Sequence, residues 1–292
     1  MAERFADAAD VLRRLGDADY LADPVIASAV FLADRLEKPL LVEGPAGVGK
    51  TELAKTVSTI TPARLIRLQC YEGLDESRAL FEWNYRKQLL RIQAGGGSAG
   101  GDWSMVEEDI FSEPFLLARP LLQAVRAEDD VVLLIDEVDR VEVETEALLL
   151  EVLAEFQVTI PELGTVRGVR RPFVVLTSNG TRELSEALRR RCLYLPIDYP
   201  SMERERDILL ARIPGIEERL ATQVARVVRA TRRLDLRKTP SISEAIDWAR
   251  ALMALGHVEV TEDSLGETLS VLVKSRPDLL TAQRELHAGG SG

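Results

Sequence analysis

A short apolar run, a glycine-rich segment and a helical pattern follow one another early in the chain. The run Pro39–Val42 (PLLV) is typical of a buried strand, and Thr51–Thr59 carries apolar residues at helical spacing. Between them, GPAGVGKT fits the pattern G-x-x-x-x-G-K-[ST] in the strand–loop–helix context that the pattern requires. Such a loop directs backbone N–H groups at phosphate oxygens, and the helix start adds partial positive charge. The segment therefore predicts a polyphosphate site.

The residues of this loop have distinct expected roles. Lys50 would reach the β- and γ-phosphates of a nucleotide, and the Thr51 hydroxyl would ligate Mg²⁺. The other residues would surround the phosphates: Gly44, Pro45, Ala46, Gly47, Val48 and Gly49. The alternative is an ordinary strand, turn and helix with a chance lysine, which the match to the whole pattern disfavours.

Four further apolar runs predict the rest of a parallel sheet. They are Val131–Ile135 and Phe173–Leu176, with the weaker Arg64–Leu68 and Leu193–Ile197. Runs without alternation are typical of strands covered on both faces. Helical patterns at Leu117–Arg126 and Glu144–Phe156 alternate with these runs. We therefore predict a three-layer α/β domain over residues 1–200, with helices on both faces of a parallel sheet.

Two insertions interrupt this alternation. The first, about residues 71–110, holds an aromatic cluster (Phe81, Trp83 and Tyr85) and the glycine-rich run 94–101, which we expect to be a mobile connection. The cluster is either a contact surface for another protein or an ordinary buried cluster. The second insertion, Gln157–Arg171, has two β-prone stretches around a Pro/Gly turn and predicts a hairpin.

The strand signals stop after Tyr199, and a small helical domain is predicted over residues 201–288. Its amphipathic stretches are Met202–Ile213, Ile216–Ala230, Ile242–Leu255 and Ser264–Val273. The last four residues, 289–292 (GGSG), are expected to be a flexible tail.

Adjacent carboxylates end the most apolar run. Asp136 and Glu137 directly follow VVLLI, and acids at a buried strand tip are costly unless they are paired or have a charged ligand. Asp136 would hold Mg²⁺, and Glu137 would orient and deprotonate an attacking water. The alternative is a helix N-cap. Nearby Asp139 is expected at a solvated helix start.

Polar and basic groups follow the next apolar strand. Asn179 lies at its end, where open α/β sheets bind ligands, and would position the water; a turn residue before Gly180 is the alternative. The cluster Arg189–Arg191 ends the next helix, where basic residues also complement the helix dipole. One of these arginines could instead act as a finger on a neighbouring subunit's γ-phosphate, which predicts a head-to-tail ring.

Composition narrows the classes of partner. The chain has 37 Lys and Arg against 48 Asp and Glu, a net charge of −11, which disfavours nucleic acid because such binding needs clustered positive charge. Cys70 and Cys192 have no metal-ligand spacing, so we expect two buried reduced thiols. No apolar stretch approaches the roughly 18 residues of a membrane span. We therefore expect a cytoplasmic protein.

The phosphate loop, LLIDEVD, TSN, the arginine cluster and the trailing helical region, in this order, resemble the AAA+ ATPases over about residues 20–254. More narrowly, the chain resembles the MoxR branch and its CoxD-like proteins, which are associated with maturation of molybdenum-containing carbon monoxide dehydrogenase. The narrower resemblance rests on the insertion after the second strand, on QVTIPELGTVRGVRRPFVVLTSN, and on KTPSISEAIDWARAL.

The resemblance implies ATP and Mg²⁺ as cofactors and assigns family roles to individual residues. Asp136 and Glu137 correspond to Walker B, Asn179 to sensor 1, and Arg190 or Arg191 to the finger.

The sequence departs from the family near Ser241, where Lys238 or Arg237 would replace the sensor-2 arginine. Three further residues have open roles: Gln69 as a polar switch that holds the catalytic glutamate, and Tyr20 and Ile26 in an adenine pocket or in the core.

The function implied is a Mg²⁺-dependent ATPase that remodels a protein client. We expect a homo-oligomer, a hexameric ring, with a von Willebrand factor A domain partner and a metalloenzyme client. The alternatives are a motor directed at nucleic acid and a nucleotide-switched assembly module.

Overall fold

The computed structural model of the protein describes residues 4–95 and 109–289. It divides into two compact units. The first comprises Met1–Glu43 and Thr51–Leu195, and the second comprises Gly44–Lys50 and Pro196–Gly292. Among the described residues, no helix combines the length and the apolar character needed to cross a membrane.

A five-stranded sheet forms the centre of the first unit, in the order β2-β5-β8-β1-β9. The pairs β2·β5, β5·β8 and β8·β1 are parallel. Every residue of β5 and β8 is buried, as expected of strands covered on both faces. All five predicted strands are present: β1 (Leu40–Glu43), β2 (Arg64–Gln69), β5 (Val131–Asp136), β8 (Phe173–Ser178) and β9 (Leu193–Pro196).

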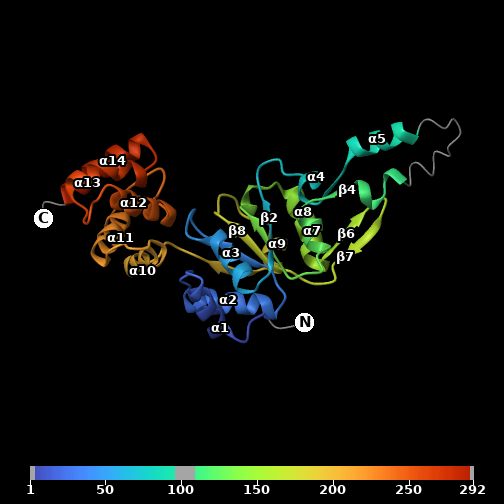
Figure 1. The fold of residues 1–292 in the computed structure, drawn as a ribbon, viewed down its shortest axis with the longest axis horizontal. Helices are drawn as coiled ribbons and strands as arrows, with labels where there is room; N and C mark the ends of the chain where they lie inside the picture. Colours follow the sequence, from blue (N-terminus) through green and yellow to red (C-terminus); the bar gives the residue numbers. More distant parts are fainter. Residues whose placement is uncertain (1–3, 96–108, 290–292) are drawn as a thin grey trace. The chain divides into compact units, whose positions relative to one another are not determined.

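Helices lie on both sides of this sheet (Figure 1). On one side, Leu133 and Ile135 of β5 share a hydrophobic core with α7 (Pro120–Val125) and α8 (Val143–Glu155). Figure 1 shows α3 (Lys50–Ile60) on the other side. The predicted three-layer α/β architecture is confirmed.

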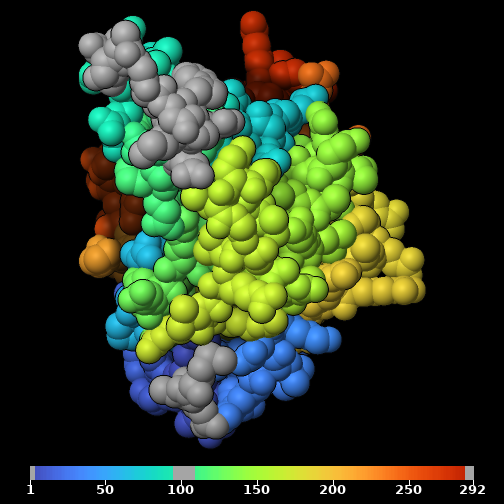
Figure 2. Space-filling model, turned by 90° about the vertical axis from the view of Figure 1, so that its right-hand side faces the viewer, coloured from blue at the N-terminus to red at the C-terminus, as the bar shows by residue number. Residues whose placement is uncertain are grey.

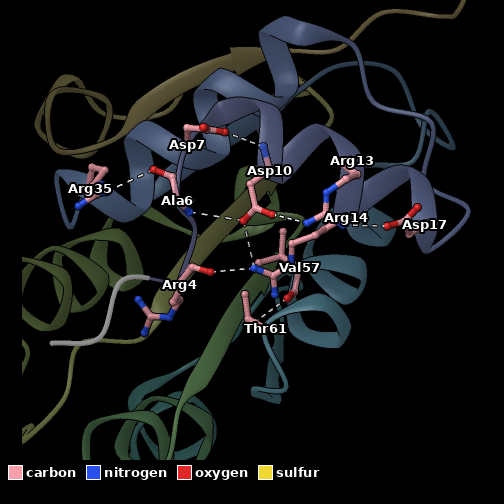
Figure 3. A network of polar contacts seen from close by, with 10 residues as sticks. All are labelled: Arg4, Ala6, Asp7, Asp10, Arg13, Arg14, Asp17, Arg35, Val57 and Thr61. Atoms are coloured by element: carbon pink, nitrogen blue, oxygen red, sulfur yellow. Dashed lines mark hydrogen bonds and ion pairs between the residues drawn. The ribbon is translucent and has the colours of Figure 1, made fainter.

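Two N-terminal helices precede the sheet, α1 (Ala8–Asp17) and α2 (Pro24–Arg35). Figure 3 shows the polar network that fixes the segment before α1. Arg14 donates to the Arg4 carbonyl at 2.8 Å and lies over the buried Phe5 ring, while Asp10 accepts from Arg13 at 2.6 Å. The network anchors the start of the described chain to α1.

The first insertion contains α4 (Glu76–Ala79), β3 (Phe81–Trp83), α5 (Tyr85–Gly95), the 3-10 helix η1 (Glu113–Phe115) and β4 (Leu116–Ala118). The predicted helix 117–126 is wrong at its start, because β4 pairs antiparallel with β3. Helix α7 begins only at Pro120. The residue before a proline rarely adopts helical dihedral angles, whereas proline itself is favoured at the first position of a helix. Of the glycine-rich run, residues 96–101 lie outside the described residues.

The second insertion is the predicted hairpin, formed by β6 (Gln157–Ile160) and β7 (Gly164–Arg167). Its register pairs Val158 with Val166, and its turn ends at Gly164, which has a φ of 79°. Figure 2 shows the hairpin, in yellow-green, on the surface of the first unit.

The second unit contains the helices α10 (Met202–Arg212), α11 (Glu218–Arg232), α12 (Ile242–Ala254), α13 (Glu262–Leu272) and α14 (Arg276–Gly289). Its core surrounds the fully buried Trp248, whose indole N–H donates to Thr268 at 2.7 Å. A buried bidentate ion pair, at 2.7 and 2.8 Å, joins Arg232 of α11 to Glu205 of α10. Helix α14 follows the four predicted amphipathic stretches and includes Gly289, while residues 290–292 lie outside the described residues.

Candidate functional site

The loop between β1 and α3 needs its glycines for two physical reasons. Gly47 and Gly49 have φ values of 73° and 97°, a region that side chains rarely adopt. In addition, a Cβ on Gly44 would lie 1.8 Å from the Ile197 carbonyl oxygen, and one on Gly47 would lie 2.2 Å from the Cβ of Ser241. The loop is therefore curled and closely packed within the second unit.

Lys50 is buried at the end of this loop, with only 6% of its surface exposed. Its ammonium donates to the carbonyl oxygens of Gly44 and Pro45 at 2.6 and 2.7 Å. A buried ammonium must have acceptors nearby, and these carbonyls hold it within the curl. The remaining loop residues differ in exposure: Val48 is buried, whereas Ala46 and Gly47 are exposed.

The start of α12 packs against the same loop in the second unit. The Ile242 amide donates to the Gly47 carbonyl at 3.2 Å, and Ser241 caps the helix in a reciprocal pair with Glu244. Burial raises the pKa of Glu244, but hydrogen bonds from Ser241 and Lys238 outweigh it and lower the pKa overall. Lys238 itself is 60% exposed and donates to Glu244 at 2.9 Å.

In the first unit, the Asp136 carboxylate is a hub of hydrogen bonds at the end of β5. Its Oδ1 accepts from the hydroxyls of Thr51 at 2.9 Å and Thr177 at 2.5 Å. Its Oδ2 accepts from the Arg67 guanidinium at 2.5 and 3.1 Å. The side chain is 3% exposed, so these donors replace water around the charge. The predicted pair of oxygen ligands, Thr51 and Asp136, is thus brought together.

Glu137 begins a turn in the left-handed conformation, with a φ of 58° and a ψ of 48°. Its backbone N–H donates to the Thr177 hydroxyl at 2.9 Å, and its carboxylate forms an ion pair with Arg140 at 2.8 Å. A non-glycine residue in this conformation is uncommon, and such residues cluster at functional sites. One third of the side chain is exposed, so water can reach the carboxylate.

Arg67 is a site residue that the sequence reasoning missed. Gln69, the expected switch residue, accepts a hydrogen bond from Arg67 and donates to the Cys70 carbonyl at 3.3 Å. Gln69 is in register with Asp136, so Arg67, two residues earlier on the same face of β2, reaches that carboxylate. The sequence RLIRLQ shows only that Arg67 lies on the same strand face as Gln69, whereas its pairing with Asp136 depends on the register with β5.

Asp139 corrects an expectation. It is 3% exposed and does not lie at a solvated helix start. Its Oδ2 accepts from the Thr181 backbone N–H at 3.0 Å and from the Thr181 hydroxyl at 2.6 Å. It therefore binds the loop that follows β8. The half-buried Asn179 stands in that loop, directly after Ser178, the last residue of β8.

The arginine cluster lies at the end of α9 (Glu186–Arg191), which Ser185 caps. Arg189 lies over the Tyr194 ring, with its guanidinium carbon 5.6 Å from the ring centre. Arg190 pairs with Glu186 one turn earlier on the surface, and both side chains are 76% exposed. Arg191 donates to the Ala187 carbonyl at 3.1 Å. Arg190 and Arg191 are thus both at the surface.

The remaining candidate residues fall into buried and exposed groups. Trp83 is buried and meets Phe111 edge to face at 5.2 Å, whereas Tyr85 is 62% exposed, so the expected aromatic cluster is divided. Ile26 belongs to the core, and Tyr20 is half-buried.

Both cysteines are buried free thiols, as expected. Burial raises the pKa of each to about 12, and for Cys70 the carboxylates of Asp136, Asp139 and Glu137 add to the effect. Among the described residues, no group of three or more His, Cys, Asp or Glu side chains could hold a metal ion.

The family model described as AAA domain (dynein-related subfamily) matches residues 39–192. The chain belongs to this AAA family. Membership implies that the AAA domain binds ATP with a divalent metal and hydrolyses it. The match begins just before β1 and ends just after α9, so it includes every candidate residue of the first unit from Thr51 to Arg191.

Relatives of this AAA protein include an uncharacterized protein of Staphylococcus haemolyticus, 26% identical over 235 residues, or 78% of this chain and 80% of the relative. A Staphylococcus aureus relative is 26% identical over 226 residues, or 75% and 77%. A variant of Thermotoga maritima RuvB matches with a TM-score of 0.50 and 18% identity, covering 90% of this chain and 69% of that one. This last likeness supports the AAA+ fold alone.

Proposed function

We propose that this AAA protein is a Mg²⁺-dependent ATPase of MoxR type that couples hydrolysis to remodelling a protein client. One observation carries the proposal. The Thr51 hydroxyl lies 2.9 Å from the Asp136 carboxylate, and Glu137 follows Asp136 with its carboxylate partly open to water. A hydroxyl, a carboxylate and an adjacent base are the protein groups that phosphoryl transfer to water requires.

The donor chemistry at Asp136 fits a divalent metal. Thr51 and Asp136 would hold Mg²⁺, because hydroxyl and carboxylate oxygens are ligands that it prefers. When bound, Mg²⁺ would neutralise charge on the β- and γ-phosphates. Lys50 and the backbone N–H groups of the loop residues other than Pro45 would bind the same phosphates.

Glu137 is proposed as the general base and Asn179 as the residue that orients the attacking water. The strained backbone of Glu137 separates its side chain from the Asp136 hub, so that two adjacent carboxylates have different partners. The ion pair with Arg140, at 2.8 Å, holds the Glu137 carboxylate in place. An ionised carboxylate can accept the proton of the attacking water.

The proposed assembly is a homo-oligomeric ring, expected to be a hexamer. Support comes from the exposed guanidinium of Arg190 and from Arg191 beside it on the surface. Either could reach a γ-phosphate bound by a neighbouring subunit, as an arginine finger does. Lys238 would act as sensor 2 in its own subunit, after exchanging Glu244 for phosphate.

The proposed client is a metalloenzyme that is undergoing maturation or cofactor assembly, with a von Willebrand factor A domain protein as partner. These proposals rest on the resemblance to MoxR and CoxD-like proteins.

We also propose a division into domains. Residues 1–200 are the nucleotide-binding domain, with insertions at 71–110 and 157–171, and residues 201–288 are a helical lid. The hairpin on the surface of the first unit (Figure 2) is a proposed contact site for other proteins. Tyr85, which is 62% exposed, is another.

A motor directed at nucleic acid is the main alternative. The net charge of −11 disfavours it, because counterion release requires clustered Lys and Arg. Stimulation of ATPase activity by DNA or RNA, lost with rising salt, would favour this alternative. An assembly module would instead act with a non-hydrolysable ATP analogue alone.

The proposed function is tested at Lys50. Lys50→Ala is expected to lose both nucleotide binding and Mg²⁺-dependent phosphate release, because the buried ammonium has no substitute in the loop. Lys55→Ala is the matched control, since Lys55 lies on the exposed side of α3 and pairs with Glu52 at 3.8 Å. Fluorescent-nucleotide titration and phosphate release measure the two effects. Unchanged nucleotide binding by Lys50→Ala would contradict the proposal.

A further inference from the structure

The turn that follows β5 is hydrogen-bonded both to the end of β8 and to the loop that follows β8. After β5 comes a turn with the 3-10 helix η2 (Val138–Arg140), and after β8 comes the loop 179–185. At one end the Glu137 amide donates to the Thr177 hydroxyl. At the other end Thr181 donates twice to Asp139. Asn179 lies midway between Thr177 and Thr181.

The backbone around Asn179 has little independent freedom. Ser178 is fully buried and in register with Glu43 of β1, so the chain is fixed where the loop begins. The Gly180 amide donates to the Ser178 hydroxyl at 3.0 Å, and Gly180 has a φ of 70°. Only Asn179 and Gly180 separate this fixed point from the Thr181 pair of hydrogen bonds.

The hydrogen bonds that Asp139 accepts from Thr181 have a charged acceptor. Burial raises the pKa of Asp139, but the hydrogen bonds from Thr181 and the nearby backbone amides of Asn179 and Asp139 outweigh it and lower the pKa. The carboxylate is therefore ionised at neutral pH, and hydrogen bonds to a charged acceptor are about twice as strong as neutral ones.

A second carboxylate fixes the rest of the loop independently of Asp139. Glu146 of α8 is 1% exposed and accepts from Arg182 and from the Ser185 amide, the latter at 3.0 Å. Arg182 also donates to the Val141 carbonyl at 2.7 Å. Because Glu146 keeps residues 182–185 in place, loss of the Thr181 bond would free only residues 179–181.

We propose that Asp139 is a positioning residue for Asn179: through its two hydrogen bonds to Thr181 it holds the amide side chain at a fixed place relative to Glu137. This inference rests on the proposed function, in which Glu137 and Asn179 act on the same water. A shift of about 1 Å in such a group can reduce a rate by as much as 10²-fold. Neither Asp139 nor Thr181 needs to touch the nucleotide.

Thr181→Val tests the inference, because it removes the hydroxyl bond to Asp139 and keeps the shape and the backbone bond. We expect kcat for ATP to fall at least about tenfold while the dissociation constant for nucleotide stays within about twofold of the wild-type value. Thr181→Ser keeps the hydroxyl and should restore kcat. Thr222→Val is the matched control, since its hydroxyl donates to the Glu218 carbonyl within α11.

Combination with Asn179→Ala separates a positioning role from a general one. If Asp139 acts through Asn179, Thr181→Val should change kcat by less than about twofold in the Asn179→Ala background. If the reductions in kcat caused by Thr181→Val and Asn179→Ala multiplied in the double variant, the inference would be overturned. A normal kcat for Thr181→Val would also overturn it, as would equal losses of kcat and thermal stability in Thr181→Val and Thr181→Ser. A wild-type chain without ATPase activity would instead overturn the proposed function.

Discussion

At the residue level, the site depends on buried carboxylates that accept several hydrogen bonds each. Asp136, Asp139 and Glu146 are each no more than 3% exposed, and each accepts at least two hydrogen bonds. For Asp139 and Glu146 these hydrogen bonds hold the pKa below its ordinary value, so protonation of either group weakens its contribution to stability.

Glu146 gives a pH prediction. Burial raises its pKa, but hydrogen bonds from Ser185 and Arg182 outweigh that effect, so the folded pKa lies below the unfolded value of 4.5. The stabilisation is present above that value and is lost as the pH falls through the folded pKa. The gap in melting temperature between wild type and Glu146→Gln should therefore be full at pH 7 and shrink below about pH 4.5.

Thermal unfolding between pH 3 and pH 7 measures this gap. Glu144→Gln, at an exposed position of the same helix, is the control and should show no such change. A gap that widened as the pH fell would contradict the assignment.

The residues of the site were partly predictable from the sequence. The phosphate loop and the pair Asp136 and Glu137 follow apolar strands directly, so their position needed only local patterns. Arg67 and the Asp139–Thr181 pair depend on register between β2, β5 and β8, which local patterns do not supply.

At the scale of elements, the loop between β1 and α3 is closely packed. Gly44→Ala would place a Cβ 1.8 Å from the Ile197 carbonyl oxygen, a backbone atom that cannot move without distorting the chain. We expect Gly44→Ala to lower the melting temperature and abolish nucleotide binding.

Gly266→Ala is the matched control for this substitution. Gly266 lies inside α13, and a Cβ there meets nothing within 4 Å. Alanine should stabilise the helix by about 0.5–1 kcal/mol. Thermal unfolding and fluorescent-nucleotide titration of both variants compare the two sites, and an unaltered Gly44→Ala protein would contradict the close packing.

Helices and strands were predicted correctly where burial of one face or of both faces leaves a periodic pattern of apolar residues in the sequence. The five strands of the central sheet follow from apolar runs. Four helices of the second unit, α10 to α13, follow from helical periodicity. The short strands β3 and β4 were missed because three-residue strands have almost no pattern of their own, and their pairing joins residues far apart in the sequence. Helices α1, α2 and α14 were missed too, although Asp7 and Asp23 cap the first two.

For the molecule as a whole, the exposed Arg190 and Arg191 predict sites that a neighbouring subunit completes. A variant with Arg190→Ala and Arg191→Ala should lack activity alone, as should Lys50→Ala. Mixing the two should restore activity at interfaces where an intact Lys50 meets an intact arginine, on the order of a quarter of the sites in a random ring.

Phosphate release by the mixture, compared with each variant alone, measures this complementation. Wild type mixed with Lys50→Ala shows whether that variant enters the assembly. A mixture that assembles but gains no activity would argue against a finger acting in trans.

Glu137 is proposed to activate water for ATP hydrolysis without itself binding the phosphates. The most direct measurement compares nucleotide affinity and single-turnover hydrolysis in Glu137→Gln, with the exposed Glu142→Gln as control. We expect Glu137→Gln to bind ATP nearly as well as wild type and to hydrolyse it at least about 10²-fold more slowly. Hydrolysis by Glu137→Gln at the wild-type rate would contradict this proposal.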